Sequence, residues 1–410
     1  MKKKHLVILL MVAAIIGVIG LLIYQKQSAD WSGRASGIGE KVLPDFPVND
    51  VQSLTVNNGS ETAEIVKKGD KWQVRNRYGY PADFARIKQN LMKLRTMKIV
   101  QSFTVSPEEY GQIQVNRPSE ENDEKTGVSL LCKNSKGDKV ADIILGKNHR
   151  KKSGGGMMSM MSPGSVGRYI RVADYQKGEE KTVLVSESFR QFSADPADWL
   201  DPEFVKIENP EKIMLQDTSD GSSWTLRKND DGDWLLEGMQ EGKNLKDSAV
   251  RRLAGAFERA DFEDVAAPSI KAEDTGLNKP KVVTYFTENG LRYTLRFGGQ
   301  IDDDDGYYLR LHASYIGAQD AKQKKGDTEE GDEEVAEKDD AQTEDEKKSV
   351  AELKEKVEKI NSKYGNWTYI IPKRTANRVL KTRDELAENK KKHEAEQTEK
   401  AKNESTSSSG

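Results

Sequence analysis

Cysteine is almost absent from this sequence, because Cys132 is the only one among 410 residues. A lone cysteine excludes an intramolecular disulfide framework. It also excludes a lipoprotein anchor, since no cysteine directly follows the apolar N-terminal segment at residues 6–24. Cys132 shares its alternation with Val128 and Leu130, which predicts a buried residue in a strand. A nucleophilic thiol would need a basic partner that the sequence does not place.

Histidine and the common catalytic motifs are scarce as well. No two histidines have the spacing of a metal-binding pair, and the chain has only His5, His149, His312 and His393. Asp302 to Asp305 precede Gly306, but a calcium loop in that register would place Ile301 and His312 at two of its acidic positions. No phosphate loop and no Gly-x-Ser-x-Gly elbow is present. We therefore predict no enzyme, and no catalytic, cofactor-binding or metal-ligating residue.

The charge of the chain is high but nearly balanced. Charged residues make up 32% of the sequence and hydrophobic residues 35%, with a formal net charge of −3. This balance excludes a general basic nucleic-acid binder. The low apolar fraction predicts that part of the chain is linker or tail, not packed core.

One long apolar run lies near the N-terminus. Residues 6–24 carry no charge, and their length suits a helix that crosses a bilayer core of roughly 30 Å. Lys2, Lys3 and Lys4 precede the run, and Lys26 is the first charge after it. Positive charge before the segment predicts a cytoplasmic N-terminus at residues 1–5 and an extracytoplasmic bulk.

A cleaved signal peptide is the alternative for this segment. Its apolar core is usually about 7–15 residues long and ends at a small-residue cleavage site. The run here is longer, and Gln27-Ser28-Ala29 is a poor cleavage site. We therefore predict an uncleaved single-pass anchor, followed by a linker at residues 25–44.

Two tryptophan-containing hairpin patterns occur along the chain. Trp72 follows Gly69-Asp70, and Trp234 follows Asp231-Gly232-Asp233. Each tryptophan comes after two short apolar strands, marked by Leu54, Val56 and Ile65 in the first copy and by Ile213, Leu215, Trp224 and Leu226 in the second. Alternation with Gly-Asp turns is typical of β-hairpins. We predict that both tryptophans pack in the core.

A one-faced helical pattern follows each tryptophan at the same distance. In the first copy Asp83 is a candidate N-cap, and the apolar positions are Phe84, Ile87, Leu91 and Leu94. In the second copy Asp247 is the candidate N-cap, and the apolar positions are Val250, Leu253 and Phe257. Such helices need a sheet against which to bury their apolar face.

Three further landmarks recur in the same order. The first is a glycine before a proline, at Tyr110-Gly111 with Pro118 and at Gly276 with Pro280. The second is a strand that ends in glycine, at Ile144-Leu145-Gly146 and at Arg296-Phe297-Gly298. The third is a Tyr-x-Arg strand, at Tyr169 to Arg171 and at Tyr308 to Arg310. In the second copy Asn289-Gly290 predicts a hairpin turn in which both residues have positive φ.

These repeats predict an α+β fold. We expect a transmembrane helix and then two repeated domains of mostly antiparallel sheet, each with one packed helix. The first domain covers residues 45–203 and the second covers residues 204–373. Residues 374–410 are expected to form a charged helix followed by a disordered tail.

Different insertions account for the unequal spacing of the two copies. The first copy carries a Met/Gly-rich loop at residues 150–167, which includes Met157, Met158, Met160 and Met161. Thioethers can bind Cu(I) or give an adaptable contact surface, but we favour a plain disordered loop. The second copy carries an acidic insertion at residues 318–348, too polar to order itself. A helix face follows it, marked by Val350, Leu353, Val357 and Ile360.

The landmarks together resemble the domain-of-unknown-function family 4340, over roughly residues 45–380. Members of that family look like bacterial, membrane-anchored proteins with the same tryptophan hairpin, helix, Leu-Gly strand end and Tyr-x-Arg strand, often duplicated. The resemblance implies association with ABC-type transport systems of the gliding-motility type. These motifs are structural, and no catalytic residue carries over.

The residues and the resemblance together predict a non-enzymatic accessory protein. It would be anchored in the bacterial inner membrane through residues 6–24, with its bulk in the periplasm and integral membrane ABC transporter subunits as partners. The alternative is a binding module for an envelope glycan or lipid, which would need a concave apolar pocket. A hydrolase is a further alternative and would need a clustered acid–base pair, which the sequence does not show.

Overall fold

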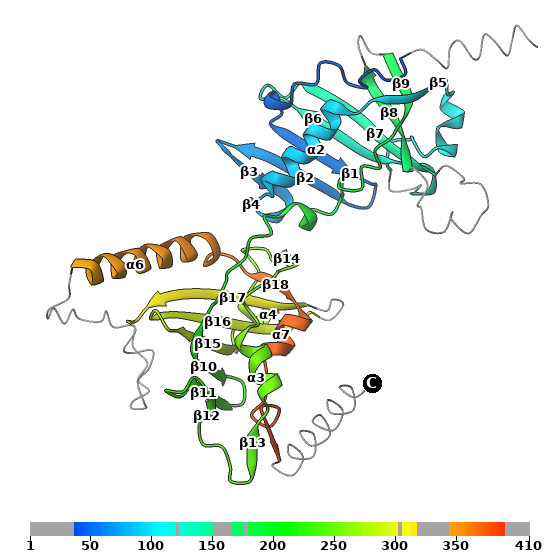
Figure 1. Cartoon of the computed structure of the whole chain (residues 1–410). Coiled ribbons are helices and arrows are strands. Elements are labelled where there is room, and N and C mark those ends of the chain that lie inside the picture. Colours follow the sequence, from blue (N-terminus) through cyan, green and yellow to red (C-terminus); the bar gives the residue numbers. More distant parts are fainter. Residues whose placement is uncertain are drawn as a thin grey trace, which may run out of the picture. The chain divides into compact units, whose positions relative to one another are not determined.

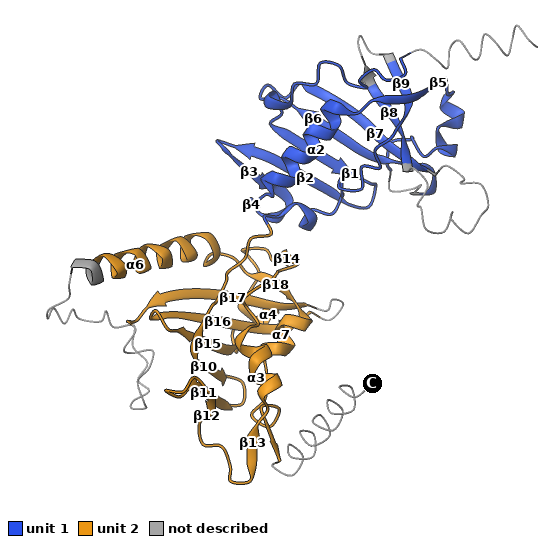
Figure 2. Ribbon diagram, in the orientation of Figure 1, with its two compact units in different colours: residues 1–201 blue, residues 202–410 orange. Residues whose placement is uncertain are grey.

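The computed structural model describes residues 37–119, 123–150, 166–175, 179–301, 306–317 and 344–389. The chain divides into two compact units, residues 1–201 and residues 202–410 (Figure 2). The predicted anchor at residues 6–24 lies outside the described residues, as do most of the Met/Gly-rich loop and of the acidic insertion. None of the helices in the described ranges has the length and apolar character to span a membrane.

The first unit is built on an antiparallel sheet with nine described strands in the order β4-β3-β2-β1-β6-β7-β8-β9-β5 (Figure 1). The strands are β1 (Ser53–Asn57), β2 (Thr62–Lys68), β3 (Lys71–Val74), β4 (Tyr80–Pro81), β5 (Ile99–Phe103), β6 (Val128–Lys133), β7 (Lys139–Arg150), β8 (Val166–Tyr175) and β9 (Glu179–Val185). The α-helix of the unit is α2 (Phe84–Thr96). Short 3₁₀ turns are η1 (Val48–Asp50), η2 (Arg75–Arg77), η3 (Pro107–Gln112), η4 (Asp123–Lys125) and η6 (Ala197–Trp199).

The second unit has an antiparallel sheet of eight described strands in the order β12-β11-β10-β15-β16-β17-β18-β14. The strands are β10 (Pro210–Asp217), β11 (Ser223–Lys228), β12 (Trp234–Leu236), β14 (Asp264–Val265), β15 (Lys281–Thr287), β16 (Leu291–Gln300), β17 (Gly306–Tyr315) and β18 (Tyr369–Pro372). A separate pair joins β13 (Lys243–Leu245) to β19 (Ala387–Asn389). The helices are α3 (Asp247–Ala254), α4 (Ala272–Thr275), α6 (Glu344–Tyr364) and α7 (Lys373–Val379). The predicted α+β class is confirmed, although this unit has more than the one expected helix.

Both sheets follow the same path. From β3 to β5 the first sheet runs β3-β2-β1-β6-β7-β8-β9-β5, and the second runs β12-β11-β10-β15-β16-β17-β18-β14 with the same order of elements along the chain. The helices α2 and α3 occupy the same place, after the third of these strands in sequence. In the first unit one more strand, β4, lies outside β3.

The pairing register also agrees between the units. Trp72 lies opposite Lys67, and Trp234 lies opposite Lys228. The Tyr-x-Arg strands are aligned in the same way. Their central residues Ile170 and Leu309 lie opposite Leu145 and Phe297, the residues before the strand-end glycines. The landmarks that recur in the sequence therefore occupy equivalent positions in the two sheets.

The strand-end glycines mark the same irregularity in both sheets. The register shifts after Leu145 in β7 and after Phe297 in β16. A Cβ atom on Gly146 would lie 2.5 Å from the carbonyl oxygen of Ile113, and one on Gly298 would lie 2.1 Å from that of Thr275. The backbone of a preceding loop crosses each bulge so closely that only glycine fits.

Helix α2 packs largely as its pattern predicts. Ile87, Leu91 and Leu94 are buried, and the Asp83 carboxylate accepts a hydrogen bond from the backbone N–H of Arg86 at 2.9 Å. Phe84, which was predicted to lie on the buried face, is instead 61% exposed. Helical side chains lean toward the N-terminus and cover the preceding turn, and the first helical residue has no such turn to cover.

The start of α3 differs from the prediction. Asp247 is the first helical residue, not the N-cap, and Lys246 occupies the N-cap position without a side-chain capping bond. The backbone N–H of Lys246 bonds to the carbonyl oxygen of Leu386, so packing and not a side chain fixes this helix start. Val250 and Leu253 are buried as predicted, while Phe257 is buried beyond the helix end.

Only one of the two predicted tryptophan anchors is fully packed. Trp72 is 8% exposed, whereas Trp234 is only half-buried. The difference in exposure follows from β4, which covers the edge of the sheet beside β3. No described strand lies in the equivalent place beside β12. The buried tryptophan of the second hairpin is Trp224, whose indole N–H donates to the carbonyl oxygen of Lys381 at 2.6 Å.

Residues 374–389 belong to the packed second unit, not to a tail. Helix α7 buries Ala376 and Val379, and Leu386 has no exposed surface. Strand β19 then pairs with β13. Charged residues between these buried positions conceal the pattern in the sequence. Residues 390–410 lie outside the described part of the chain.

Candidate functional site

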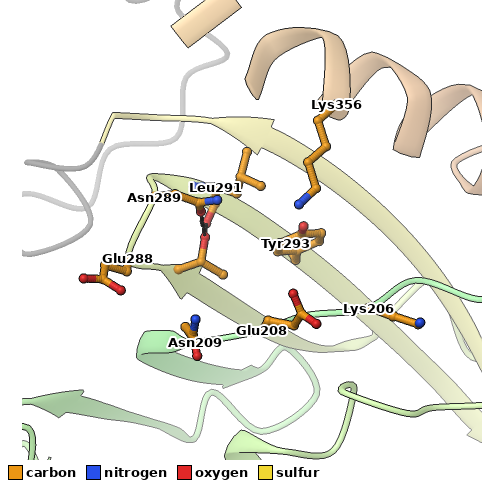
Figure 3. Close-up of a pocket in the computed structure, with 9 residues that line it drawn as sticks. Lys206, Glu208, Asn209, Glu288, Asn289, Leu291, Tyr293 and Lys356 are labelled. Atoms are coloured by element: carbon orange, nitrogen blue, oxygen red, sulfur yellow. Dashed lines mark hydrogen bonds between the residues drawn. The ribbon is translucent and has the colours of Figure 1, made fainter. Parts of the chain in front are cut away.

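A pocket of about 200 Å³ opens beside the β15–β16 hairpin of the second unit (Figure 3). Three segments of the unit build it: the stretch before β10, the hairpin itself and α6. Its lining residues are Lys206, Glu208, Asn209, Thr287, Glu288, Asn289, Leu291, Tyr293 and Lys356. Most of these side chains are polar, and the charged ones are exposed.

The turn of the hairpin shapes one wall of the pocket. The backbone N–H of Gly290 donates to the carbonyl oxygen of Thr287 at 3.0 Å, and that of Leu291 donates to Thr287 Oγ1 at 3.2 Å. Gly290 has a φ of +80°, but Asn289 is not among the residues with positive φ. The prediction that both residues adopt positive φ was therefore wrong for Asn289. A turn that ends in one left-handed glycine needs positive φ at that residue alone.

Tyr293 lies at the base of the pocket, and the Lys356 side chain extends toward it from α6 (Figure 3). Burial, reinforced by the negative charge of Glu208, raises the pKa of Tyr293 to about 12. The phenol therefore stays protonated at neutral pH and cannot serve as a base there. The nearby charges of Lys206 and Glu208 are of opposite sign, so the pocket has no strong preference for a cation or an anion.

The pocket is small for an organic ligand. Small-molecule sites usually enclose about 300–1,000 Å³ and have mostly apolar walls. This one is smaller, and its rim is polar and exposed. It lacks the concave apolar lining that a glycan- or lipid-binding module would need. Its chemistry suits ordered water or a small ion.

An ionic cluster around the buried Arg171 holds the Tyr-x-Arg strand of the first unit. The Arg171 guanidinium lies 3.2 and 3.1 Å from the two carboxylate oxygens of Glu180 and 4.4 Å above the ring of Tyr110. The Tyr110 hydroxyl donates to the same carboxylate at 2.7 Å. Burial, with the help of Glu180, raises the pKa of Tyr110. These contacts attach η3 to β8 and β9, so the cluster has a structural role.

The half-buried Arg168 and the buried Asp142 of the first unit are also bound by neighbouring polar groups. Burial lowers the pKa of Arg168 to about 10, and its guanidinium donates to the carbonyl oxygens of Gly146 and Ser188 at 2.8 and 3.0 Å. Burial alone would raise the pKa of Asp142, but hydrogen bonds from Arg117 and Lys139 lower it. These pairs stabilise the bulge and β7, and they leave no free base or nucleophile among them.

The residues singled out in the sequence do not come together. Cys132 is fully buried, and burial raises the pKa of its thiol to about 12, which makes it a core residue. His149 contacts the Tyr169 hydroxyl at 3.3 Å, and His312 is exposed on β17. The remaining candidates lie outside the described residues: His5, His393, Asp302 to Asp305, and Met157, Met158, Met160 and Met161. Within the described part of the chain, no group of three or more His, Cys, Asp or Glu side chains could hold a metal ion.

Sequence reasoning did not find Glu180 or the hairpin pocket. The Tyr-x-Arg motif marks the strand that carries Arg171, but nothing in the sequence connects it to a glutamate on the next strand. The pocket brings together residues 206–209, 287–293 and 356, and no local pattern links these segments.

Comparison with known proteins gives a match to a protein family. A family model described as "Domain of unknown function (DUF4340)" matches residues 72–280. This range begins at Trp72 in β3 and ends at Pro280, just before β15, so it takes in parts of both units. Comparison with curated proteins and with solved structures gave no match.

Proposed function

We propose that this chain, which belongs to the DUF4340 family, is a non-enzymatic accessory protein of the bacterial inner membrane. Residues 6–24 anchor it as a single helix, with the N-terminus in the cytoplasm. The two units lie in the periplasm and bind integral membrane subunits of an ABC-type transport system.

The observation that supports an accessory role is the duplicated sheet, in which potentially reactive groups serve packing. Cys132 is fully buried, and the Tyr285 hydroxyl donates to the carbonyl oxygen of Leu253 inside the second unit. Arg171 is held by Glu180 and Tyr110. A scaffold of this kind offers surfaces and sheet edges, which are the features that bind proteins.

The anchor rests on hydropathy and flanking charge. Residues 6–24 are uncharged, and three lysines precede them within the first five residues. A charged side chain at the centre of a membrane helix costs about 2.5–3.5 kcal/mol on insertion scales. Two charges placed mid-segment should therefore abolish stable insertion.

Affinity purification from membranes tests the proposal. A C-terminally tagged chain is crosslinked in cells, extracted in mild detergent and analysed by mass spectrometry. We expect an ABC permease and its ATPase to co-purify with the native chain. The variant Ile15→Arg/Ile16→Arg should lose both carbonate-resistant membrane association and these partners, whereas Ile15→Val/Ile16→Val should keep them. Absence of every ABC subunit from the crosslinked native sample would refute the partner assignment.

A further inference from the structure

The two units treat one edge of their sheets differently. In the first unit β4 closes the edge, with Pro81 opposite Gln73 and Tyr80 opposite Val74. The backbone N–H of Ala82 also donates to the carbonyl oxygen of Trp72 at 2.9 Å. The main chain of β3 thus has a strand on each side.

The counterpart of β4 in the second unit is β13, which is not part of the eight-stranded sheet. In both units the residue just before the helix donates its backbone N–H to a buried residue of the C-terminal segment: Asp83 to Trp199, and Lys246 to Leu386. The preceding strands are therefore equivalent. However, β13 pairs with β19 and not with β12.

Within the described part of the chain, the main chain on the outer side of β12 therefore has no partner strand. Leu235 lies opposite Arg227 in β11, and the backbone N–H of Glu237 donates to the carbonyl oxygen of Thr225. By the alternation of an antiparallel ladder, the N–H and C=O groups of Trp234 and Leu236 then face away from β11. No described strand pairs with them there, although Leu236 accepts a turn hydrogen bond from Met239.

Apolar side chains accompany this edge. Leu235 is 40% exposed and Met239 is 37% exposed, while Trp234 is half-buried. The equivalent tryptophan beside the closed edge, Trp72, is 8% exposed. An extended segment placed beside β12 would cover Trp234 as β4 covers Trp72.

We propose that β12 accepts an extended segment of a partner protein, paired antiparallel in the way that β4 pairs with β3. The internal copy indicates the chemistry of that segment. Tyr80 and Ala82 are 2% and 8% exposed, so the occupant carries a large apolar residue and a small residue two positions apart. Main-chain bonds give such complexes affinity, and alternate side chains give them specificity. The assignment of the segment to an ABC transporter subunit rests on the proposed function.

Site-directed photocrosslinking tests this docking surface. Cys132 is the one native cysteine and is fully buried. A cysteine introduced at the surface can therefore be labelled without labelling Cys132. The full-length Leu235→Cys variant is labelled with benzophenone-maleimide and irradiated in native membranes. The Met214→Cys variant, treated in the same way, is the matched control. Met214 is 36% exposed and lies on β10, two strands from the edge. We expect an adduct from position 235 whose partner residues map to one extended segment with the predicted alternation, and at least about tenfold less adduct from position 214.

A charge placed on the edge gives the second readout. Leu235→Lys should lower recovery of the crosslinked partner about tenfold, because an edge lysine opposes strand addition. Met214→Lys should change the recovery less than about twofold, since the position lies away from the edge. Thermal melting of both variants should match the native chain, which shows that folding is not the cause.

The outcomes separate this inference from the proposed function. Equal adducts at both positions, no adduct at position 235, or an adduct between two copies of this chain would overturn the docking surface, even if ABC subunits co-purify. An adduct with a matching extended segment of a protein that is not an ABC subunit would support the docking surface and overturn the partner assignment.

Discussion

Replacing Gly298 by alanine is expected to destabilise the second unit, whereas the same replacement at its neighbour Gly299 should be nearly neutral. A Cβ atom at position 298 would lie 2.1 Å from the carbonyl oxygen of Thr275 and 3.2 Å from Cγ of Leu277. At position 299 the nearest atom is the same oxygen at 3.7 Å, which is ordinary contact. Neither glycine has a positive φ, so the two variants differ in this contact and not in backbone strain.

The magnitude follows from the close approach. To accept the methyl group at position 298, β16 or the end of α4 must move by about 1 Å, and overpacking of this kind costs about 1–3 kcal/mol. Gly299→Ala should stay within about 0.5 kcal/mol of the native chain. With a urea m value of about 2 kcal/mol/M, the midpoint of Gly298→Ala should fall by about 0.5–1.5 M.

Hydrogen exchange in increasing urea, read by mass spectrometry, resolves the two units by their peptides. The midpoint should fall for β16 and β17 in Gly298→Ala and for β7 and β8 in Gly146→Ala, whose Cβ would lie 2.5 Å from the Ile113 oxygen. Equal midpoints for Gly298→Ala and Gly299→Ala would refute the close-approach argument.

Two further predictions concern the second unit. Burial alone would raise the pKa of Asp217, but hydrogen bonds from Lys281 and Ser219 lower it from 3.8 to about 2. This carboxylate therefore stabilises the fold above pH 3.8 and loses that effect as the pH falls toward 2. Asp217→Asn should therefore lower the free energy of unfolding by about 1–2 kcal/mol at pH 7, and denaturation at a series of pH values should show the difference vanishing near pH 2. The Asn361 side chain bonds to both the N–H and the C=O of Ala313 at 2.8 Å, so Asn361→Ala should cost about 1–3 kcal/mol. It should also speed amide exchange in β17 and α6, whereas Ser362→Ala on the exposed face should not.

The repeat was readable from the sequence because hairpins and amphipathic helices are local patterns. Trp72 and Trp234 align across the two copies, and the structure gives each a lysine as its cross-strand partner. The glycines at the strand ends align as well, since each stands at a bulge where a loop crosses closely. Local spacing therefore carried the order of elements and much of the register.

Burial at the edge could not be read in the same way. Alternation predicts which face of a strand Trp234 occupies, but it does not reveal whether another strand lies alongside. That depends on the loop after each hairpin: residues 75–79 return the chain to β3, while residues 237–242 lead it away to β13. The hairpin pocket has a similar origin, because Lys356 reaches it from a helix that follows a long insertion.

The second sheet differs from the first beside β17 as well as beside β12, and the difference at β17 bears on the open edge at β12. In the first unit β8 and β9 stay paired out to Tyr175 and Glu179, whereas β17 and β18 are paired only as far as Leu309 and Tyr369. Beyond that point α6 covers β17, and an asparagine side chain takes the place of a strand at Ala313. Helix α6 thus covers this side of the second sheet, whereas no described strand covers the outer side of β12. Because exposed strand edges favour unwanted pairing, an edge left open with apolar side chains beside it is best explained by a partner that covers it.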